Sequence, residues 1–243
     1  MANGYKICIP ARLESSRLEQ KLLRNVNGKT IIQRTWERCL DSSADTVTVI
    51  TDSTEIFDLI SGLGGDCFIS QSVHESGTDR LAEYTKYQNL PEDLILINVQ
   101  GDEPLININS VNKLADFVLS NGSNYATICK PFESSENEAD VNKVKVHIDS
   151  ENMAVSFFRK ATDDMANTFH HIGVYAYSVG FLNTFSSLPQ SPNEEALKLE
   201  QMRALDNNHN IHVLVVEDYK SIGIDTPEDL EKFKILIEQI ENN

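Results

Sequence analysis

The sequence predicts a three-layer α/β fold with a mainly parallel central sheet. Short apolar segments alternate with segments of helical spacing through the first half of the chain, which is typical of βα units. Residues 94–97, Leu-Ile-Leu-Ile, are apolar at every position, as expected for a strand that helices cover on both faces. A chain of 243 residues is long enough for one such core. We expect a single domain over residues 1–243, with a small antiparallel lobe inserted at about residues 141–190.

Composition argues against several kinds of partner. The net charge of -16 and the pI near 4.7 do not suit binding to duplex nucleic acid or to an anionic membrane surface. No apolar run approaches the ~20 residues that span a bilayer, and the first residues lack the pattern of a signal peptide. We expect a cytoplasmic protein with no nucleic-acid partner and no membrane partner.

The four cysteines are expected to be reduced thiols in the core. They are widely spaced and mostly lie among apolar neighbours, and no C-x-x-C pair suggests a metal site. They are Cys8, Cys39, Cys67 and Cys129.

A first strand at residues 5–10 leads into a long polar loop at residues 11–27. The loop concentrates positive charge in an acidic protein, since it carries Arg12, Arg17 and Lys21. A loop after the first strand of such a sheet is a common phosphate-binding position. The chain contains neither G-x-x-x-x-G-K-[ST] nor G-x-G-x-x-G. The residues alone leave open a basic loop that is merely solvated.

Residues 31–69 continue the alternation of helices and strands. Ile32, Trp36 and Cys39 have helical spacing, and a strand follows at residues 46–50. A second helix with an apolar face at residues 56–63 precedes a short strand at residues 67–69. Trp36 lies on the apolar stripe of its helix, so we assign it to the core and not to a binding surface.

A hydroxyl-rich turn then opens a helix at residues 74–83, His-Glu-Ser-Gly-Thr-Asp-Arg-Leu-Ala-Glu. Ser76 or Thr78 can cap this helix and so stabilise it by about 1 kcal/mol. Capping alone explains the local pattern.

The apolar strand at residues 94–97 runs into Asn-Val-Gln-Gly-Asp-Glu-Pro at residues 98–104. Ligands of such sheets bind outside the carboxyl ends of the strands, so Asp102 is expected to project into a cleft. Gly101 permits a close approach of the backbone, and Pro104 prevents the strand from continuing. The alternative is an ordinary turn at the end of a strand.

The second half of the chain has a different pattern. A helix over residues 111–118 and a strand at residues 125–128 precede an acidic, Ser-rich exposed loop at residues 133–140. Three β-rich pieces follow at residues 144–148, 153–158 and 172–177, which predict the antiparallel lobe. An amphipathic helix at residues 197–205 and a strand at residues 211–216 complete this region. His147, His209 and His212 carry no motif and are expected on the surface or in strands.

A last helix begins near residue 227. Thr226 is its expected cap, Pro227 suits its first position, and Asp229 completes a capping box. This account leaves Asp225, one residue before the cap, without a structural task.

Several of these segments resemble those of the sugar-activating cytidylyltransferases, most closely the 3-deoxy-manno-octulosonate (Kdo) cytidylyltransferases. The loop at residues 9–29 is similar to that family's R-x-x-S-x-R-L-P-G-K-P-L, although Glu19-Gln20 stands here in place of Pro-Gly. Residues 74–83 resemble H-x-S-G-T-x-R-x-A-E, and residues 98–104 match N-V-Q-G-D-E-P. Residues 199–203 look like L-E-Q-L-R, and residues 224–230 look like V-D-T-P-E-D-L.

The resemblance covers nearly the whole chain and implies a Rossmann-like nucleotidyltransferase sheet. It implies that CTP is bound by Ala11, Arg12, Ser15, Lys21, Ser76, Gly77, Thr78, Arg80 and Gln100. It implies that the sugar acid is bound by Arg159, His171, Tyr175, Glu200 and Gln201. Asp102 and Asp225 would hold Mg²⁺, and with Arg12 and Lys21 they would be the catalytic residues. The family also implies a homodimer.

The expected activity is transfer of CMP from CTP to Kdo or a closely related 3-deoxy-ulosonic acid, with release of pyrophosphate, for lipopolysaccharide or capsule synthesis. One alternative is a nucleotidylyltransferase for another sugar acid or for a sugar phosphate. Another is a non-catalytic nucleotide-binding protein of the same fold, because fold alone does not establish function.

Overall fold

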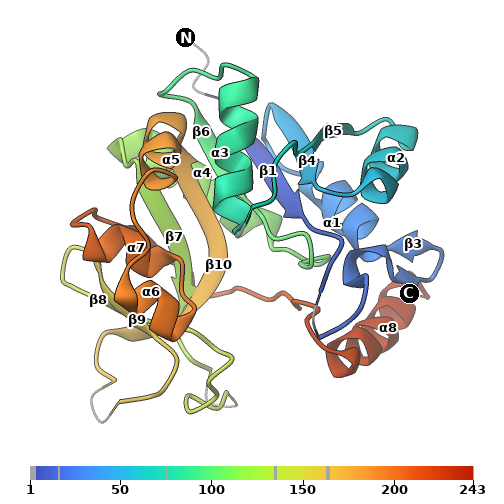
Figure 1. Ribbon diagram of the computed structural model, residues 1–243. Helices are drawn as coiled ribbons and strands as arrows, with labels where there is room; N and C mark the ends of the chain where they lie inside the picture. Colours follow the sequence, from blue (N-terminus) through green and yellow to red (C-terminus); the bar gives the residue numbers. More distant parts are fainter. Residues whose placement is uncertain (1–3, 16, 75, 134–135, 163–164, 243) are drawn as a thin grey trace.

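The computed structural model describes residues 4–15, 17–74, 76–133, 136–162 and 165–242, and over these residues nine strands form one sheet (Figure 1). The order along the sheet is β11 (His212–Val215), β7 (Tyr125–Lys130), β10 (Thr168–Ser178), β6 (Ile95–Asn98), β1 (Tyr5–Ala11), β4 (Thr46–Thr51) and β5 (Asp66–Ile69). In this row β10 is antiparallel to both of its neighbours, and the other neighbouring pairs are parallel. The expected mainly parallel sheet is confirmed.

Helices cover both faces of this sheet, because successive residues of its strands point to opposite sides. In β1, Ile7 and Ile9 join one buried cluster and Cys8 joins the other. The first cluster is completed by α1 (Ile31–Cys39), α2 (Thr54–Gly62), α4 (Ile108–Asn121) and α8 (Pro227–Glu241). The second is completed by α3 (Gly77–Tyr87), α5 (Val179–Phe185) and α7 (Gln201–Asp206), with α6 (Pro192–Leu197) beside α7. The three-layer prediction is therefore confirmed.

The β-rich region joins the central sheet through β10. Residues 168–170 of β10 pair with β8 (Lys145–Ile148), which pairs in turn with β9 (Ala154–Phe158), whereas residues 170–177 pair with β7. All of these pairings are antiparallel, as expected. The predicted lobe is thus an extension of the central sheet, and its limits at residues 141–190 stay a prediction. A separate hairpin is formed by β2 (Asn25–Val26) and β3 (Lys29–Thr30).

Most of the local predictions are confirmed. Trp36 is buried, and the cysteines are free, with Cys67 half-buried and the other three buried. Ser76 is the N-cap of α3, and Thr226 and Asp229 form the expected capping box of α8. None of the helices in the described part of the chain is both long and apolar enough to cross a bilayer.

Three local predictions need correction. The helix expected at residues 197–205 is broken, because α6 starts earlier at a capping box and Lys198 then takes a left-handed conformation with φ 54° before α7. The loop at residues 11–27 contains a 3₁₀ turn, η1 (Lys21–Leu23), and the strand β2. The loop at residues 133–140 is not uniformly exposed, since the Glu136 side chain is only 13% exposed. Some residues of the motifs and loops discussed above lie outside the described residues, namely Ser16, Glu75, Ser134 and Ser135.

Candidate active site

A cleft opens beyond the carboxyl ends of β1 and β6, which is the position expected for ligands of such a sheet. Its cavity measures about 700 Å³. One wall is the basic loop after β1, and the opposite wall is the chain between α5 and α7. Among the predicted site residues, those that line the cavity are Arg12, Lys21, Ser76, Gly77, Arg80, Gln100, Asp102, Glu200 and Asp225. Those that do not are Ala11, Ser15, Thr78, Arg159, His171, Tyr175 and Gln201.

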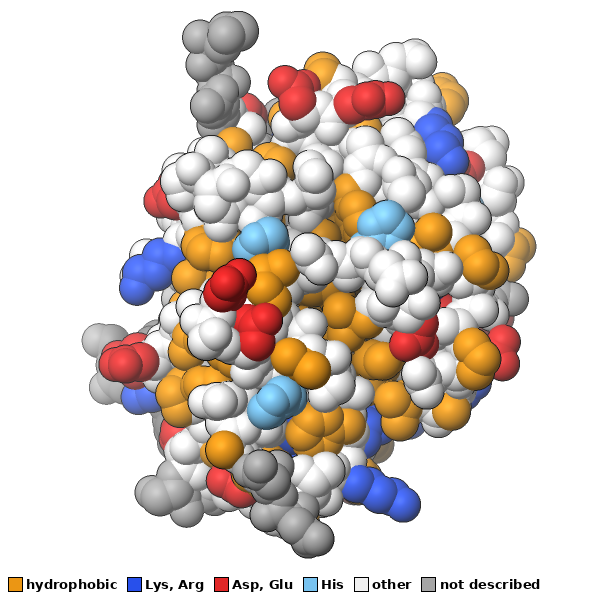
Figure 2. Space-filling view, turned by 90° about the vertical axis from the view of Figure 1, so that its left-hand side faces the viewer, with side chains coloured by type: hydrophobic (Ala, Val, Ile, Leu, Met, Phe, Trp, Pro, Cys, Tyr) orange, Lys and Arg blue, Asp and Glu red, His pale blue; other side chains and the backbone are white. Residues whose placement is uncertain are grey.

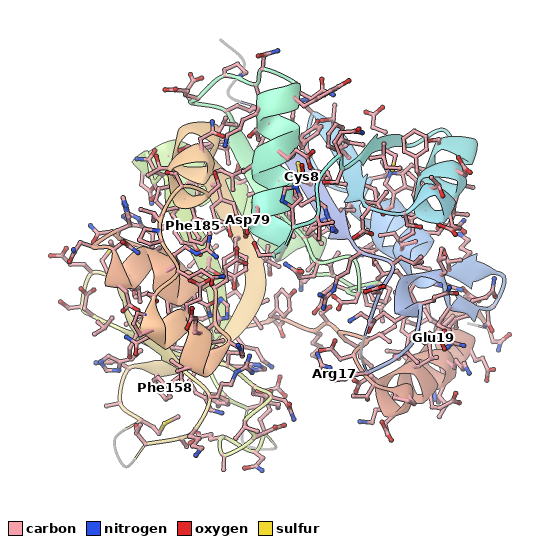
Figure 3. All side chains as sticks on the ribbon, in the orientation of Figure 1. Cys8, Arg17, Glu19, Asp79, Phe158 and Phe185 are labelled. Carbon is pink, nitrogen blue, oxygen red and sulfur yellow. The ribbon has the colours of Figure 1, made fainter. Side chains whose placement is uncertain are left out.

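The basic loop brings three cations and Glu14 to the lining of the cleft and keeps Glu19 outside it. Arg12, Arg17 and Lys21 line the cavity, whereas Glu19 is exposed and outside the lining. Figure 3 labels Arg17 and Glu19 on this loop. Gln20 has the left-handed φ of 49° that glycine adopts most easily. Lys21 thus lines the cleft although Glu19-Gln20 stands in place of Pro-Gly.

Two carboxylates from distant segments meet at Lys21. Its ammonium lies 2.5 Å from Asp102 Oδ2 and 2.7 Å from Asp225 Oδ1, and Arg17 lies 3.0 Å from the same Asp225 oxygen. Burial acts to lower the pKa of Lys21, but the two carboxylates outweigh it and raise that pKa. Burial acts to raise the pKa of Asp225, but Lys21 and Arg17 lower it overall. The pair predicted to hold a metal is therefore assembled around a cation.

The residue beside Asp102 has a different environment. Burial raises the pKa of Glu103 to about 7, against a hydrogen bond from Ser221 Oγ at 2.5 Å that acts to lower it. The negative charges of Asp102 and Asp225 raise it further. Glu103 faces Ser221 and does not line the cavity.

The start of α3 forms the adjoining wall. Ser76 Oγ accepts a hydrogen bond from the Asp79 backbone amide at 3.1 Å, and Figure 3 shows Asp79 at the foot of this helix. Arg80 is 4% exposed and donates to Asp52 at 2.6 Å. Thr78 is buried behind the wall, with its hydroxyl 3.4 Å from that of Tyr177. The structure thus brings Ser76, Gly77 and Arg80 to the cavity, and holds Thr78 one layer behind.

Gln100 and Gly101 complete the floor between the basic loop and α3. The Gln100 side-chain amide donates to Asn98 Oδ1 at 3.4 Å. A Cβ on Gly101 would lie 3.1 Å from the Pro10 carbonyl oxygen, so the expected close approach of the backbone is confirmed. These contacts bring the segment after β6 against the end of β1.

The α6–α7 corner carries two of the residues predicted to bind the sugar acid, Glu200 and Gln201. Glu200 lines the cavity, and its buried Oε1 has no hydrogen-bond partner among the described residues. Burial raises the pKa of Glu200, against hydrogen bonding by Thr78 and Ser76 that acts to lower it. Behind it, Gln201 Oε1 accepts a hydrogen bond from the Tyr175 hydroxyl at 3.4 Å. An unpaired buried acceptor of this kind suits a ligand that brings a hydroxyl donor.

His171 lies in the layer below. Its Nε2 is 2.9 Å from Thr127 Oγ1, and its ring packs edge-on against Phe157. Burial, helped by the charge of His170, lowers the pKa of His171 to about 3, so its ring is neutral at physiological pH. His171 therefore helps to pack β10, the strand that also carries Tyr175, and does not line the cavity.

Arg159 has its guanidinium on backbone carbonyls. Nε donates to Leu197 O at 2.8 Å, Nη2 to Lys198 O at 3.1 Å, and Nη1 to Val141 O at 3.3 Å. Arg159 does not line the cavity, so its direct contact with a sugar carboxylate stays a prediction. Through its hydrogen bonds to Leu197 O and Lys198 O, Arg159 contacts the corner that carries Glu200.

Sequence reasoning missed several residues that the fold brings to the site. Arg203 lines the cavity at 4% exposure, holds Glu194 at 2.6 Å and lies 4.7 Å from the centre of the Phe185 ring. Arg17 was noted only as part of a basic loop, and no motif pointed to Asp52, the partner of Arg80. The spacing of Ser191 and Glu194 is a capping-box signal, but no sequence pattern connects Glu194 to Arg203.

Comparison with known proteins gives a consistent picture. The family model described as Cytidylyltransferase matches residues 7–211. The 3-deoxy-manno-octulosonate cytidylyltransferase of Photobacterium profundum is 38% identical, over 96% of this chain and 99% of its own length. The protein of the same name from Pectobacterium carotovorum is 36% identical, over 95% of this chain and 97% of its own length.

Solved structures agree with these relatives. A CMP:2-keto-3-deoxy-manno-octonic acid synthetase complexed with CTP matches with a TM-score of 0.88 and 35% identity, over 97% of this chain and 99% of that one. A cytidylyltransferase from Leptospira borgpetersenii matches with a TM-score of 0.65 over 95% of this chain and 84% of that one. At 19% identity, the second match supports the fold alone.

Proposed function

This chain belongs to the cytidylyltransferase family, and from that membership we propose that it transfers CMP from CTP to 3-deoxy-manno-octulosonate or a close relative. The anomeric hydroxyl oxygen of the sugar acid bonds to the α-phosphorus of CTP. The bond from that phosphorus to the β-phosphate oxygen breaks, pyrophosphate leaves, and the hydroxyl proton is released. The product is the CMP-sugar acid that lipopolysaccharide or capsule synthesis would consume.

One observation carries the proposal: Lys21, Asp102 and Asp225 meet at the cleft from segments 81 and 204 residues away from the lysine. Cations facing a triphosphate and paired carboxylates beside them are what phosphoryl transfer requires. Arg12 and Lys21 would neutralise the charge that builds on the leaving pyrophosphate. No covalent intermediate on the protein is needed.

The two carboxylates also fit a magnesium ion. Both lie within 2.7 Å of one ammonium nitrogen, so a single cation can contact both. The described residues contain no group of three or more His, Cys, Asp or Glu that could hold a metal, so phosphate oxygens and water would complete the shell. A magnesium ion held there would polarise the α-phosphate and lower the pKa of the attacking hydroxyl.

The remaining residues would bind and orient the two substrates. We expect Ser76, Gly77 and Gln100, which line the cavity, to contact the cytosine and ribose, beside Arg80, which pairs with Asp52. We expect Glu200 to accept a hydrogen bond from a sugar hydroxyl, because its buried Oε1 has no partner among the described residues. Holding both substrates in one cleft supplies the orientation that a bimolecular transfer needs.

Pyrophosphate release tests this proposal. The purified chain should release pyrophosphate from CTP when a 3-deoxy-ulosonic acid is added, and a panel of such acids with each nucleoside triphosphate identifies the preferred pair. Activity with sugar phosphates but not with ulosonic acids would contradict the proposed substrate class. Binding of CTP without turnover of any acid would contradict the enzyme assignment.

We also propose a homodimer. Figure 2 shows the face that carries β8 and β9, where hydrophobic and histidine side chains gather and few basic ones are seen. On this region Val155 of β9 is 55% exposed. Light scattering on the purified chain would give twice the monomer mass, and Val155→Glu should shift that mass toward the monomer.

A further inference from the structure

A lysine outside the cleft is completely buried. Lys145, the first residue of β8, is 0% exposed, although a buried ammonium is costly unless its hydrogens are satisfied. Its three donors reach three backbone carbonyls, at 2.6 Å to Asp140 O, 2.8 Å to Lys143 O and 2.8 Å to Arg159 O. The Lys145 ammonium therefore holds backbone carbonyls in place instead of pairing with a carboxylate side chain.

These carbonyls belong to two separate segments. Asp140 and Lys143 lie in the turn before β8, and Arg159 is the first residue after β9. Lys145 therefore ties the turn to the end of β9 at the position from which the Arg159 side chain projects.

The Arg159 side chain continues the connection. Its guanidinium donates to Val141 O in the same turn and to Leu197 O and Lys198 O at the end of α6. Lys198 has the left-handed φ of 54° that breaks the helix between α6 and α7. The two cations thus hold one turn against the corner at residues 197–200.

That corner forms part of the cleft wall. Lys198, Leu199 and Glu200 line the cavity, and Gln201 follows at the start of α7. A shift of the corner would move Glu200 relative to Ser76 and Gln100, the residues proposed to contact the nucleotide. Those two residues are held in place by other elements. Misplacement by about 1 Å is enough to slow an oriented reaction substantially.

We infer that Lys145 is a positioning residue for the sugar-acid side of the cleft, acting through Arg159 on the corner at residues 197–200. This inference rests on the proposed function. It predicts that loss of the ammonium impairs use of the sugar acid while CTP binding is kept, because the three hydrogen bonds of Lys145 go to the turn before β8 and to the end of β9, and not to the basic loop or α3.

The test compares Lys145→Met with Lys143→Met as a matched control. Lys143 lies in the same turn, but its ammonium pairs with Glu136 at 2.6 Å. In Lys145→Met, kcat/KM for the sugar acid should fall about tenfold or more, and the calorimetric Kd for CTP should stay within about twofold. Amide hydrogen exchange at residues 197–203 should accelerate relative to α3. Lys143→Met should leave all three measurements unchanged.

A conservative variant and a double variant sharpen the result. Lys145→Gln keeps two N–H donors and should retain more sugar-acid activity than Lys145→Met. If Lys145 acts through Arg159, Lys145→Met combined with Arg159→Lys should cost less than the product of the two single losses.

Unchanged sugar kinetics in Lys145→Met would overturn the inference, as would a parallel loss of CTP affinity. Failure of both Lys145 variants to fold would overturn it too, because Lys145 would then support the whole fold and not one corner. The exchange measurement needs no turnover. It therefore tests the positioning role even if pyrophosphate assays were to reject the proposed function.

Discussion

The ammonium nitrogen of Lys21 lies 2.7 Å from Oδ1 of Asp225. The same nitrogen is 2.5 Å from Asp102, so one side chain compensates two carboxylates that would otherwise repel each other. If Lys21 turns toward a triphosphate, a divalent cation can take its place between the carboxylates. Phosphate binding and metal binding would then be coupled through this lysine.

The first prediction concerns the paired carboxylates. Asp102→Asn and Asp225→Asn should each remove most of the activity without unfolding the chain, because each replaces an anionic ligand by a neutral near-isostere. Mn²⁺ binding followed by electron paramagnetic resonance with CTP present should weaken in both variants, with Asp218→Asn as the control. Near-normal turnover at saturating magnesium in either variant would remove that residue from the metal site.

Base selection provides the second prediction. CTP should be preferred over UTP by about tenfold or more, because a site that pairs with an amino group leaves polar atoms unsatisfied when a carbonyl replaces it. Gln100→Ala should narrow this preference, since Gln100 lines the cavity beside Ser76. Gln33→Ala, on α1, is the control. Equal use of CTP and UTP by the unmodified chain would contradict the proposed base contacts.

Local chemistry explains which parts of the site were predictable. Asp102 could be placed from its strand, because a buried strand followed by Gly101 directs the next side chain beyond the sheet. Asp225 could be singled out because capping explained Thr226 and not its neighbour. The partners of Arg80 and Arg159 could not be predicted, since tertiary packing alone brings Asp52 and the carbonyl of Leu197 to them.

The broken helix shows the same limit. The apolar spacing at residues 197–205 is compatible with one continuous helix, whereas the structure turns at the left-handed Lys198, whose carbonyl accepts a hydrogen bond from Arg159. The spacing of the sequence cannot reveal a contact that crosses 39 residues. Lys145 was likewise read as an ordinary strand residue.

The third prediction is a pH dependence of stability at Glu136. Burial acts to raise the pKa of Glu136, but the Glu133 amide and the ammonium groups of Lys143 and Lys130 lower it to about 2. Because the folded pKa lies below the ordinary value of 4.5, the ionised carboxylate stabilises the fold above that value. This contribution is lost as the pH falls from 4.5 toward 2.

Urea unfolding measures this contribution. Glu136→Gln should be less stable than the unmodified chain at pH 7, and the difference should shrink as the pH falls through 4 toward 2. Glu138→Gln, at an exposed position of the same loop, should show no such convergence. A difference that is independent of pH would rule out the ionised carboxylate as its source.

The fourth prediction concerns the backbone at Gln20. Its φ of 49° is left-handed, which costs a side-chain-bearing residue roughly 1–2 kcal/mol. Gln20→Gly should therefore raise the midpoint of thermal unfolding, with a net gain of up to about 1 kcal/mol after the greater flexibility of glycine in the unfolded chain. Glu19→Gly, at the preceding position, should lower it. If Gln20→Gly lowered the midpoint instead, the contribution of the Gln20 side chain to stability would exceed the cost of its left-handed backbone.

The last prediction concerns Arg159. Arg159→Lys keeps the charge but loses the planar fork, so it can neither span the carbonyls of Leu197 and Lys198 nor bind a carboxylate at two points. Loss of an ionic hydrogen bond costs about 1.5–3 kcal/mol, or roughly ten- to a hundredfold in kcat/KM for the sugar acid. CTP affinity, titrated by calorimetry in the same variant, should hold.

Amide exchange at residues 197–203 without substrate then separates two roles of Arg159. Faster exchange indicates that Arg159 positions the corner, and unchanged exchange indicates direct contact with the carboxylate. A fall in CTP affinity with intact sugar kinetics would instead place Arg159 on the nucleotide side, and the proposed division of the cleft would be wrong.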